Sequence, residues 1–148
     1  MSPEDFRAKL KKKKAAMQAA HISGLQAIGM ICSTTVKNKV QKSPRGGKTY
    51  KIYTGNGNFR LHKASAAGEA PATDLGSLAR SVTYRIHESQ SMVVILCSLA
   101  LAPYAIVLEY GNSSGTLQAR PFMRPGVAEA KKKAMATYES IMSKVSNE

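Results

Sequence analysis

The 148-residue sequence has the length of one ordinary domain, and its 43% hydrophobic content excludes a wholly disordered chain. Its 22 Lys and Arg residues against 9 Asp and Glu residues give a formal net charge of +13. Such a surplus predicts an anionic partner, which composition alone leaves open between nucleic acid, a membrane surface and an acidic protein face. Residues 1–48 hold eleven basic and two acidic residues, so most of the surplus lies there.

Residues 1–42 predict one long helix. Ser2 is a favourable N-cap and Pro3 suits the first helical position. Apolar residues at spacings of mostly three, four and seven then form one stripe: Phe6, Leu10, Met17, Leu25, Ile28, Cys32, Val36 and Val40. A lysine run at 11–14 interrupts the stripe, so we expect the first turns to project from the body. The Ser-Pro-Arg-Gly-Gly segment at 43–47 should end the helix.

Residues 43–73 predict an extended arm. The alternating segment 48–53 is typical of an exposed strand, and the Gly- and Asn-rich segment 54–58 is typical of a hairpin tip. Residues 62–73 are rich in Ala, Gly, Ser and Pro and show no periodicity. We therefore expect them to form a loop that gains order from its neighbours.

Residues 74–148 predict a mixed body. We expect Asp74 to cap a short helix at 76–80. A half-buried strand at 82–86 and a buried strand at 92–99 should form an antiparallel hairpin. The last helix should begin around Pro125. That last helix should bury an apolar face: Val127, Ala134, Tyr138, Ile141 and Val145. The prediction is a single α+β domain over 1–148, with a long N-terminal helix, a small antiparallel sheet, a short helix and a C-terminal helix.

The uncharged segment 89–108 raises the alternative of a membrane span. Polar residues dilute the apolar run and Pro103 interrupts it, which favours a buried strand followed by a buried helix that ends at Gly111. The charged N-terminus has no apolar region of the kind a signal peptide needs, so we expect no signal peptide.

The sequence indicates neither an enzyme nor a metal or cofactor site. Cys32 and Cys97 lie far apart in apolar surroundings, which favours two reduced, buried thiols. His21, His62 and His87 are scattered, and His21 on the apolar helix face is best interpreted as a hydrogen-bonded structural residue. Glu109 could be a buried general acid, but a carboxylate paired with Arg120 or Arg124 is the simpler expectation.

The lysine run at 11–14 is the strongest electrostatic candidate. Lys11, Lys12, Lys13 and Lys14 could contact phosphates, although a charge run is usually a solvated face. Aromatic residues make up only 6% of the chain and tryptophan is missing, which supplies few stacking platforms for single strands. These residues favour contact with an acidic protein or with passing DNA over reading of a base sequence.

Three segments carry a family resemblance: residues 62–82 (HKASAAGEAPATDLGSLARSV), 103–111 (PYAIVLEYG) and 118–125 (QARPFMRP). In order and spacing, over roughly 62–130, they resemble the small tail-component proteins of long-tailed bacteriophages and prophages. Leu75 stands where threonine is usual, and residues 112–114 depart from the family pattern after Gly111.

The resemblance implies a virion structural protein, assembled in the host cytoplasm, that completes the tail and joins it to the head. It implies a six-fold ring of identical subunits around the DNA channel, without cofactor, enzymatic activity or membrane. Its partners would be the head connector, the tail tube or terminator proteins and, non-specifically, channel DNA. The interface residues expected from the matching segments are Pro71, Asp74, Gly76, Tyr104, Glu109, Gly111, Arg120 and Phe122. A tail-terminator ring and a small basic non-specific DNA-binding protein are the alternatives.

Overall fold

The computed structural model describes residues 2–146 and confirms the α+β class. Met1 and residues 147–148, which belong to the predicted segments 1–42 and 74–148, lie outside the described residues. The elements in chain order are α1 Pro3–Gln41, β1 Thr49–Gly55, β2 Asn58–Lys63, α2 Ser77–Ser81, β3 Val82–His87, η1 Glu88–Gln90, β4 Met92–Cys97, α3 Ala105–Tyr110 and α4 Met123–Ser146. The strands form two separate antiparallel ribbons, β1–β2 and β3–β4.

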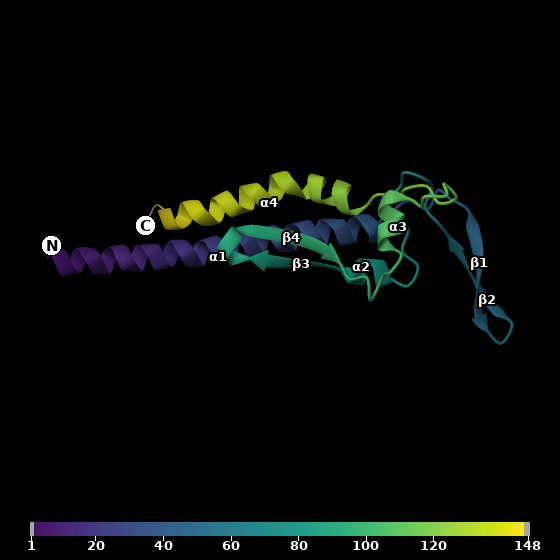
Figure 1. Ribbon diagram of the computed structural model, residues 1–148, viewed down its shortest axis with the longest axis horizontal. Coiled ribbons are helices and arrows are strands. Elements are labelled where there is room, and N and C mark those ends of the chain that lie inside the picture. The colour runs from purple at the N-terminus through teal and green to yellow at the C-terminus, as the bar shows by residue number, and fades with distance from the viewer. Residues whose placement is uncertain (1, 147–148) are drawn as a thin grey trace.

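Helix α1 is the axis of the molecule. Its 39 residues span about 58 Å. Ser2 accepts a hydrogen bond from the Asp5 amide and the Asp5 carboxylate accepts one from the Ser2 amide, so the predicted N-cap is confirmed as a capping box. The helix ends at Gln41, before the predicted breaker segment. Helix α4 lies alongside one face of α1 and the β3–β4 ribbon lies along another (Figure 1).

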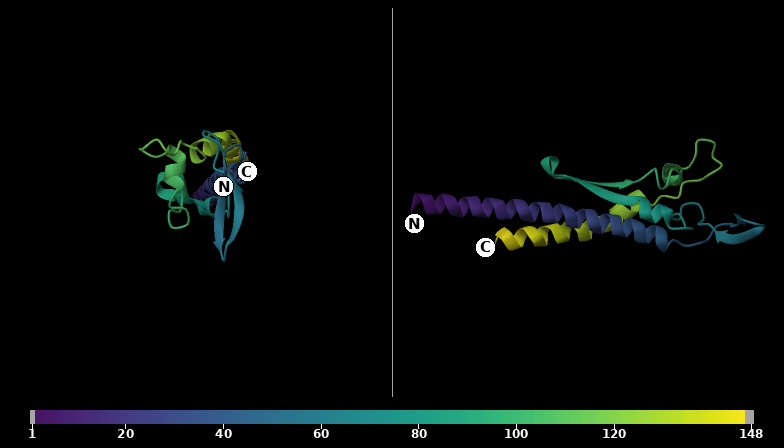
Figure 2. Two further views of the ribbon diagram at one scale, coloured as in Figure 1. Left: turned by 90° about the vertical axis from the view of Figure 1, so that its right-hand side faces the viewer. Right: turned by 90° about the horizontal axis from the view of Figure 1, so that it is seen from below.

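The N-terminal turns of α1 project beyond α4 (Figure 2), as predicted. Lys13 Nζ reaches the Ser146 carbonyl at 3.4 Å, which marks where the described part of α4 ends beside α1. Phe6, Leu10 and Met17 belong to the predicted stripe but stay exposed. Burial on α1 begins at Ala20 and continues to Val40.

Two glycines let the neighbouring layers approach α1 closely. A Cβ added at Gly24 would lie 2.5 Å from Tyr138 Cδ2 of α4, and one added at Gly29 would lie 2.2 Å from Tyr84 Cδ2 of β3. Five residues correspond to about 140° of rotation around a helix, so the two glycines face different neighbours. Gly24 and Gly29 lower the helix propensity of α1, but they are also the positions at which the neighbouring layers pack most closely against it.

The main core lies where α1, α2, β3, α3 and the start of α4 meet. Val36, Val40, Val82, Ala102 and Phe122 are its most deeply buried apolar residues. A second cluster joins Cys32 of α1 to Ala130 and Ala134 of α4. Lys131, Lys132 and Lys133 are exposed, as predicted.

Several predicted details are wrong. The strand at 92–99 ends at Cys97 and is only half-buried, because α1 covers the two-stranded ribbon from one side. Helix α3 buries Ala105 and Glu109, leaves Leu108 half-buried against the core, and exposes Ile106 and Val107. His62 and Lys63 belong to β2 rather than to the loop, and α4 begins at Met123, two residues before Pro125.

Candidate assembly site

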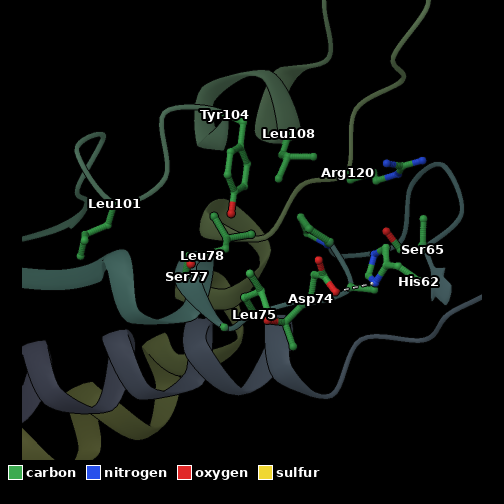
Figure 3. Close-up of a pocket in the computed structure, with 15 residues that line it drawn as sticks. His62, Ser65, Asp74, Leu75, Ser77, Leu78, Leu101, Tyr104, Leu108 and Arg120 are labelled. Atoms are coloured by element: carbon green, nitrogen blue, oxygen red, sulfur yellow. Dashed lines mark ion pairs between the residues drawn. The ribbon is translucent and has the colours of Figure 1, made fainter. Parts of the chain in front are cut away.

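The three segments on which the family resemblance rests come together around one cavity of about 470 Å³ (Figure 3). Backbone hydrogen bonds join them: the Gly68 amide donates to the Ala119 carbonyl at 3.0 Å, and the Arg120 amide donates to the Leu108 carbonyl at 2.7 Å. Five of the eight expected interface residues line this cavity, namely Pro71, Asp74, Gly76, Tyr104 and Arg120. The structure thus brings most of the sequence-derived candidates to one place.

The cavity has an apolar side and a polar side. Leu78, Leu101 and Tyr104 lie on one side, and Ser65, His62 and Arg120 lie on the other (Figure 3). Two buried polar atoms in its wall, Thr73 Oγ1 and Arg120 Nε, have no hydrogen-bond partner among the described residues. Buried polar groups are normally paired, so these two atoms are exceptions to the usual pairing.

Asp74 does not cap α2, contrary to the sequence prediction. Gly76 is the N-cap residue, with φ +76°, and no side chain caps the helix. The Asp74 carboxylate instead binds the guanidinium of Arg60 in β2 and lies 3.3 Å from His62 Nδ1. The hydrogen bonds from Arg60 are the main cause that holds the pKa of Asp74 below its usual value. Asp74 therefore anchors the base of the β1–β2 hairpin to the cavity wall.

Glu109 does not pair with Arg120 or Arg124, so that prediction is also wrong. Its carboxylate accepts hydrogen bonds from the backbone amides of Phe122, Met123 and Arg124 at 2.7, 2.9 and 3.1 Å. These amides open α4, where the helix dipole favours a negative charge. Arg124 instead donates to the Tyr110 hydroxyl at 3.1 Å and lies over its ring.

Gly111 and Phe122 support the site from within. Gly111 ends α3 with φ +78°, and a Cβ there would lie 2.9 Å from the Leu117 carbonyl oxygen. Both the backbone conformation and the close approach require glycine. Phe122 is fully buried in the main core. These two residues position the segments around the cavity, which serves the fold of the single chain.

Lys11, Lys12, Lys13 and Lys14 lie toward the N-terminal end of α1, far from the cavity, and all four are exposed; Lys13 lies beside the end of α4. Nothing in the fold brings them to the cavity, so any partner they contact meets the molecule at its other end.

The sequence interpretation missed two exposed apolar surfaces. One, here called the α3 surface, comprises Leu99, Leu101, Tyr104, Ile106 and Tyr110, which are all exposed. Leu101 and Tyr104 line the cavity, and the other three line a second pocket beside α3. The other lies on the β1–β2 hairpin, where Tyr53 is 73% and Leu61 64% exposed. Hydropathy marks such residues as apolar but cannot show whether the same chain covers them.

The remaining titratable groups are accounted for by structure. His21 lies between the Tyr138 hydroxyl, 2.8 Å from Nδ1, and the Ser91 hydroxyl, 3.0 Å from Nε2, as expected for a structural histidine. Cys32 and Cys97 are free thiols; Cys32 is buried and Cys97 is half-buried against the Ser81 hydroxyl. Within residues 2–146, no three His, Cys, Asp or Glu side chains gather as metal ligands, and no helix has the length and apolarity to cross a bilayer.

Comparison with protein-family models, curated proteins and solved structures finds no match to this chain. The family resemblance therefore rests on the three sequence segments alone.

Proposed function

We propose that this chain is a virion structural protein of a tailed bacteriophage that completes the tail and joins it to the head as a ring of identical subunits. The observation that carries the proposal is the convergence of segments 62–82, 103–111 and 118–125 on one cavity. Three segments that match one family in order and also adjoin in space are a stronger signal than three separate short motifs.

The α3 surface supports an assembly role. Its five exposed apolar side chains lie on a short helix and the loop before it, and two of them, Leu101 and Tyr104, line the cavity. Exposed apolar side chains that gather on one element are typical of protein–protein interfaces. A ring requires two different, complementary surfaces on each subunit, and the α3 surface would be one of them.

The elongated shape supports the same role. The projecting turns of α1 and helix α3 lie toward opposite ends of the molecule (Figure 1), so one subunit can reach neighbours on two sides. Extended elements with little core of their own are suited to contacts between subunits.

The proposal is tested by deleting the gene from the phage and complementing it with variants. The deletion should leave DNA-filled heads and tails that do not join, as seen by electron microscopy. Normal infectious particles from the deletion would refute the proposal. Abnormally long tail tubes would instead assign the chain to the tail terminator.

Complementation tests the α3 surface itself. The variant Leu101→Gln/Ile106→Gln should fold, because both side chains are exposed in the single chain. It should nevertheless fail to restore joined particles, because it removes apolar side chains from the α3 surface. Met30→Gln/Met135→Gln is the matched control, since it changes two exposed apolar residues on α1 and α4 and should restore infection. Equal complementation by both variants would remove the α3 surface from the assembly role.

A further inference from the structure

We propose that the β1–β2 hairpin is an arm that binds double-stranded DNA through the phosphate backbone, with its aromatic face against the groove. The inference does not depend on the phage role, because it rests on the charge, register and exposure of the hairpin alone.

The first observation is charge. Residues 45–68 contain five basic residues and no acidic residue. Arg60 is neutralised by Asp74, and Arg45 donates to the Thr73 carbonyl beside it at 3.4 Å. Lys48, Lys51 and Lys63 remain exposed without a carboxylate partner among the described residues. A thin ribbon that carries three free cations attracts a polyanion.

The second observation is the division of the ribbon into two faces. The register pairs Lys51 with Leu61 and Tyr53 with Phe59, which places these four side chains on one face. Tyr53 and Phe59 have ring centroids 6.2 Å apart, and Lys51 Nζ lies 4.8 Å from the centroid of Phe59.

The opposite face of the ribbon is occupied. Arg60 and His62 hold it to Asp74 at the cavity wall. The aromatic face therefore points away from its own anchor and is free to meet a partner. Tyr53 and Phe59 are 73% and 49% exposed, so their rings contribute little to the core of this chain.

Shape favours duplex DNA. The major groove of B-DNA admits a two-stranded ribbon, and lysines on such a ribbon reach the flanking phosphates. The hairpin extends clear of the body at the end opposite the N-terminus (Figures 1 and 2), which leaves room for a duplex.

A second copy of the chain is a poorer partner for this surface. Of the eight carboxylates within 2–146, five are engaged internally: Asp5, Glu69, Asp74, Glu109 and Glu129. The other three, Glu4, Glu88 and Glu139, are scattered over α1, η1 and α4. No acidic patch within the described chain matches the cations of the hairpin, so the charge points to an external polyanion.

The test is fluorescence anisotropy of a labelled mixed-sequence duplex with the purified full chain over a range of salt concentrations. Lys48→Gln/Lys51→Gln/Lys63→Gln should weaken binding at least about tenfold and reduce the salt slope by roughly 2 to 3, since each lost phosphate contact removes about 0.9. Lys131→Gln/Lys132→Gln/Lys133→Gln is the matched control, because it removes the same charge from exposed positions on α4 and should change the slope by less than about 1.

A second variant separates contact from charge. Tyr53→Ser/Phe59→Ser leaves the net charge unchanged and alters only exposed side chains, so it should fold and yet bind the duplex several-fold more weakly. Equal effects of the two lysine triples, with no effect of the aromatic variant, would overturn the proposal. So would hairpin-dependent binding that is tighter to a single-stranded probe, or hairpin variants that change the oligomeric state by sedimentation while duplex binding is unchanged.

Discussion

The Glu109 carboxylate links the end of α3 to the beginning of α4 through backbone amides alone. If Glu109 were paired with a side chain, another pair of side chains could replace that contact. The three free amides at the start of α4 instead need a hydrogen-bond acceptor, and an anion is the strongest one. Glu109 is also only 8% exposed, so solvent does not compete for these bonds. The residue thus fixes the angle at which the 118–125 segment leaves the cavity and enters α4.

Glu109→Gln should lower the free energy of unfolding by about 1 to 3 kcal/mol, because the amide loses the negative charge and turns a donor toward backbone donors. Urea denaturation measures the loss, and hydrogen exchange should quicken at Phe122, Met123 and Arg124. Glu139→Gln, on the exposed side of α4, should leave stability unchanged. Wild-type stability in Glu109→Gln together with failed assembly would show that Glu109 acts between subunits instead.

At the scale of elements, the Asp74 carboxylate joins the β1–β2 hairpin to the cavity wall. The pKa of Asp74 is lowered from the ordinary value of 3.8, first by the Arg60 hydrogen bonds and then by nearby positive charge on Arg60, His62 and Arg45. A lowered pKa in the folded state means that the stabilisation is complete above the unfolded value and is lost as the pH falls through the folded value. The anchor should therefore release only in acid.

The chemical shifts of the Arg60–Lys63 amides, followed by NMR as the pH is lowered below 3.8, should move toward those of Asp74→Asn. Asp74→Asn should show the released hairpin already at neutral pH and no further transition of these amides. Identical pH profiles in the two proteins would mean that another group holds the hairpin. Because the ion pair is partly exposed, we expect the global stability to change little.

The contact between α1 and the β3–β4 ribbon depends on Gly29. In an isolated helix, Gly29→Ala would stabilise by about 1 kcal/mol. Here the added Cβ meets the ring of Tyr84, and we expect a net loss of about 1 to 2 kcal/mol in thermal or urea unfolding. In a Tyr84→Ala background the sign should reverse. An unchanged sign there would show that the ring does not set the spacing of the two layers.

At the scale of the whole molecule, local signals predicted the elements and long-range geometry decided the site. The order of the elements was predictable because each start and stop signal affects only the residues next to it. These signals are Ser2 and Pro3, the breaker segment 43–47 and the two hairpin turns. The hydrogen-bond partners of Asp74 and Glu109 were not predictable, because these partners come close only after separate segments fold together.

Burial was overestimated for the same reason. The apolar runs at 92–99 and 103–111 predict core residues, yet one chain supplies too few layers to cover both faces of β4 and α3. No sequence signal separates an apolar residue that packs internally from one left for a partner. The α3 surface therefore became visible only in the structure.

The pairing of α1 with α4 also has a consequence for the order of synthesis. The helix that begins at Pro3 buries residues as far as Val40 mainly against a helix that starts at Met123, so its apolar stripe stays uncovered while the residues between them leave the ribosome. Contacts of such long sequence separation form late, because a large loop must close before they contribute. A nascent chain halted before Met123 would lack the α4 residues that cover Gly24 and Cys32, and would be a substrate for chaperones rather than a folded intermediate.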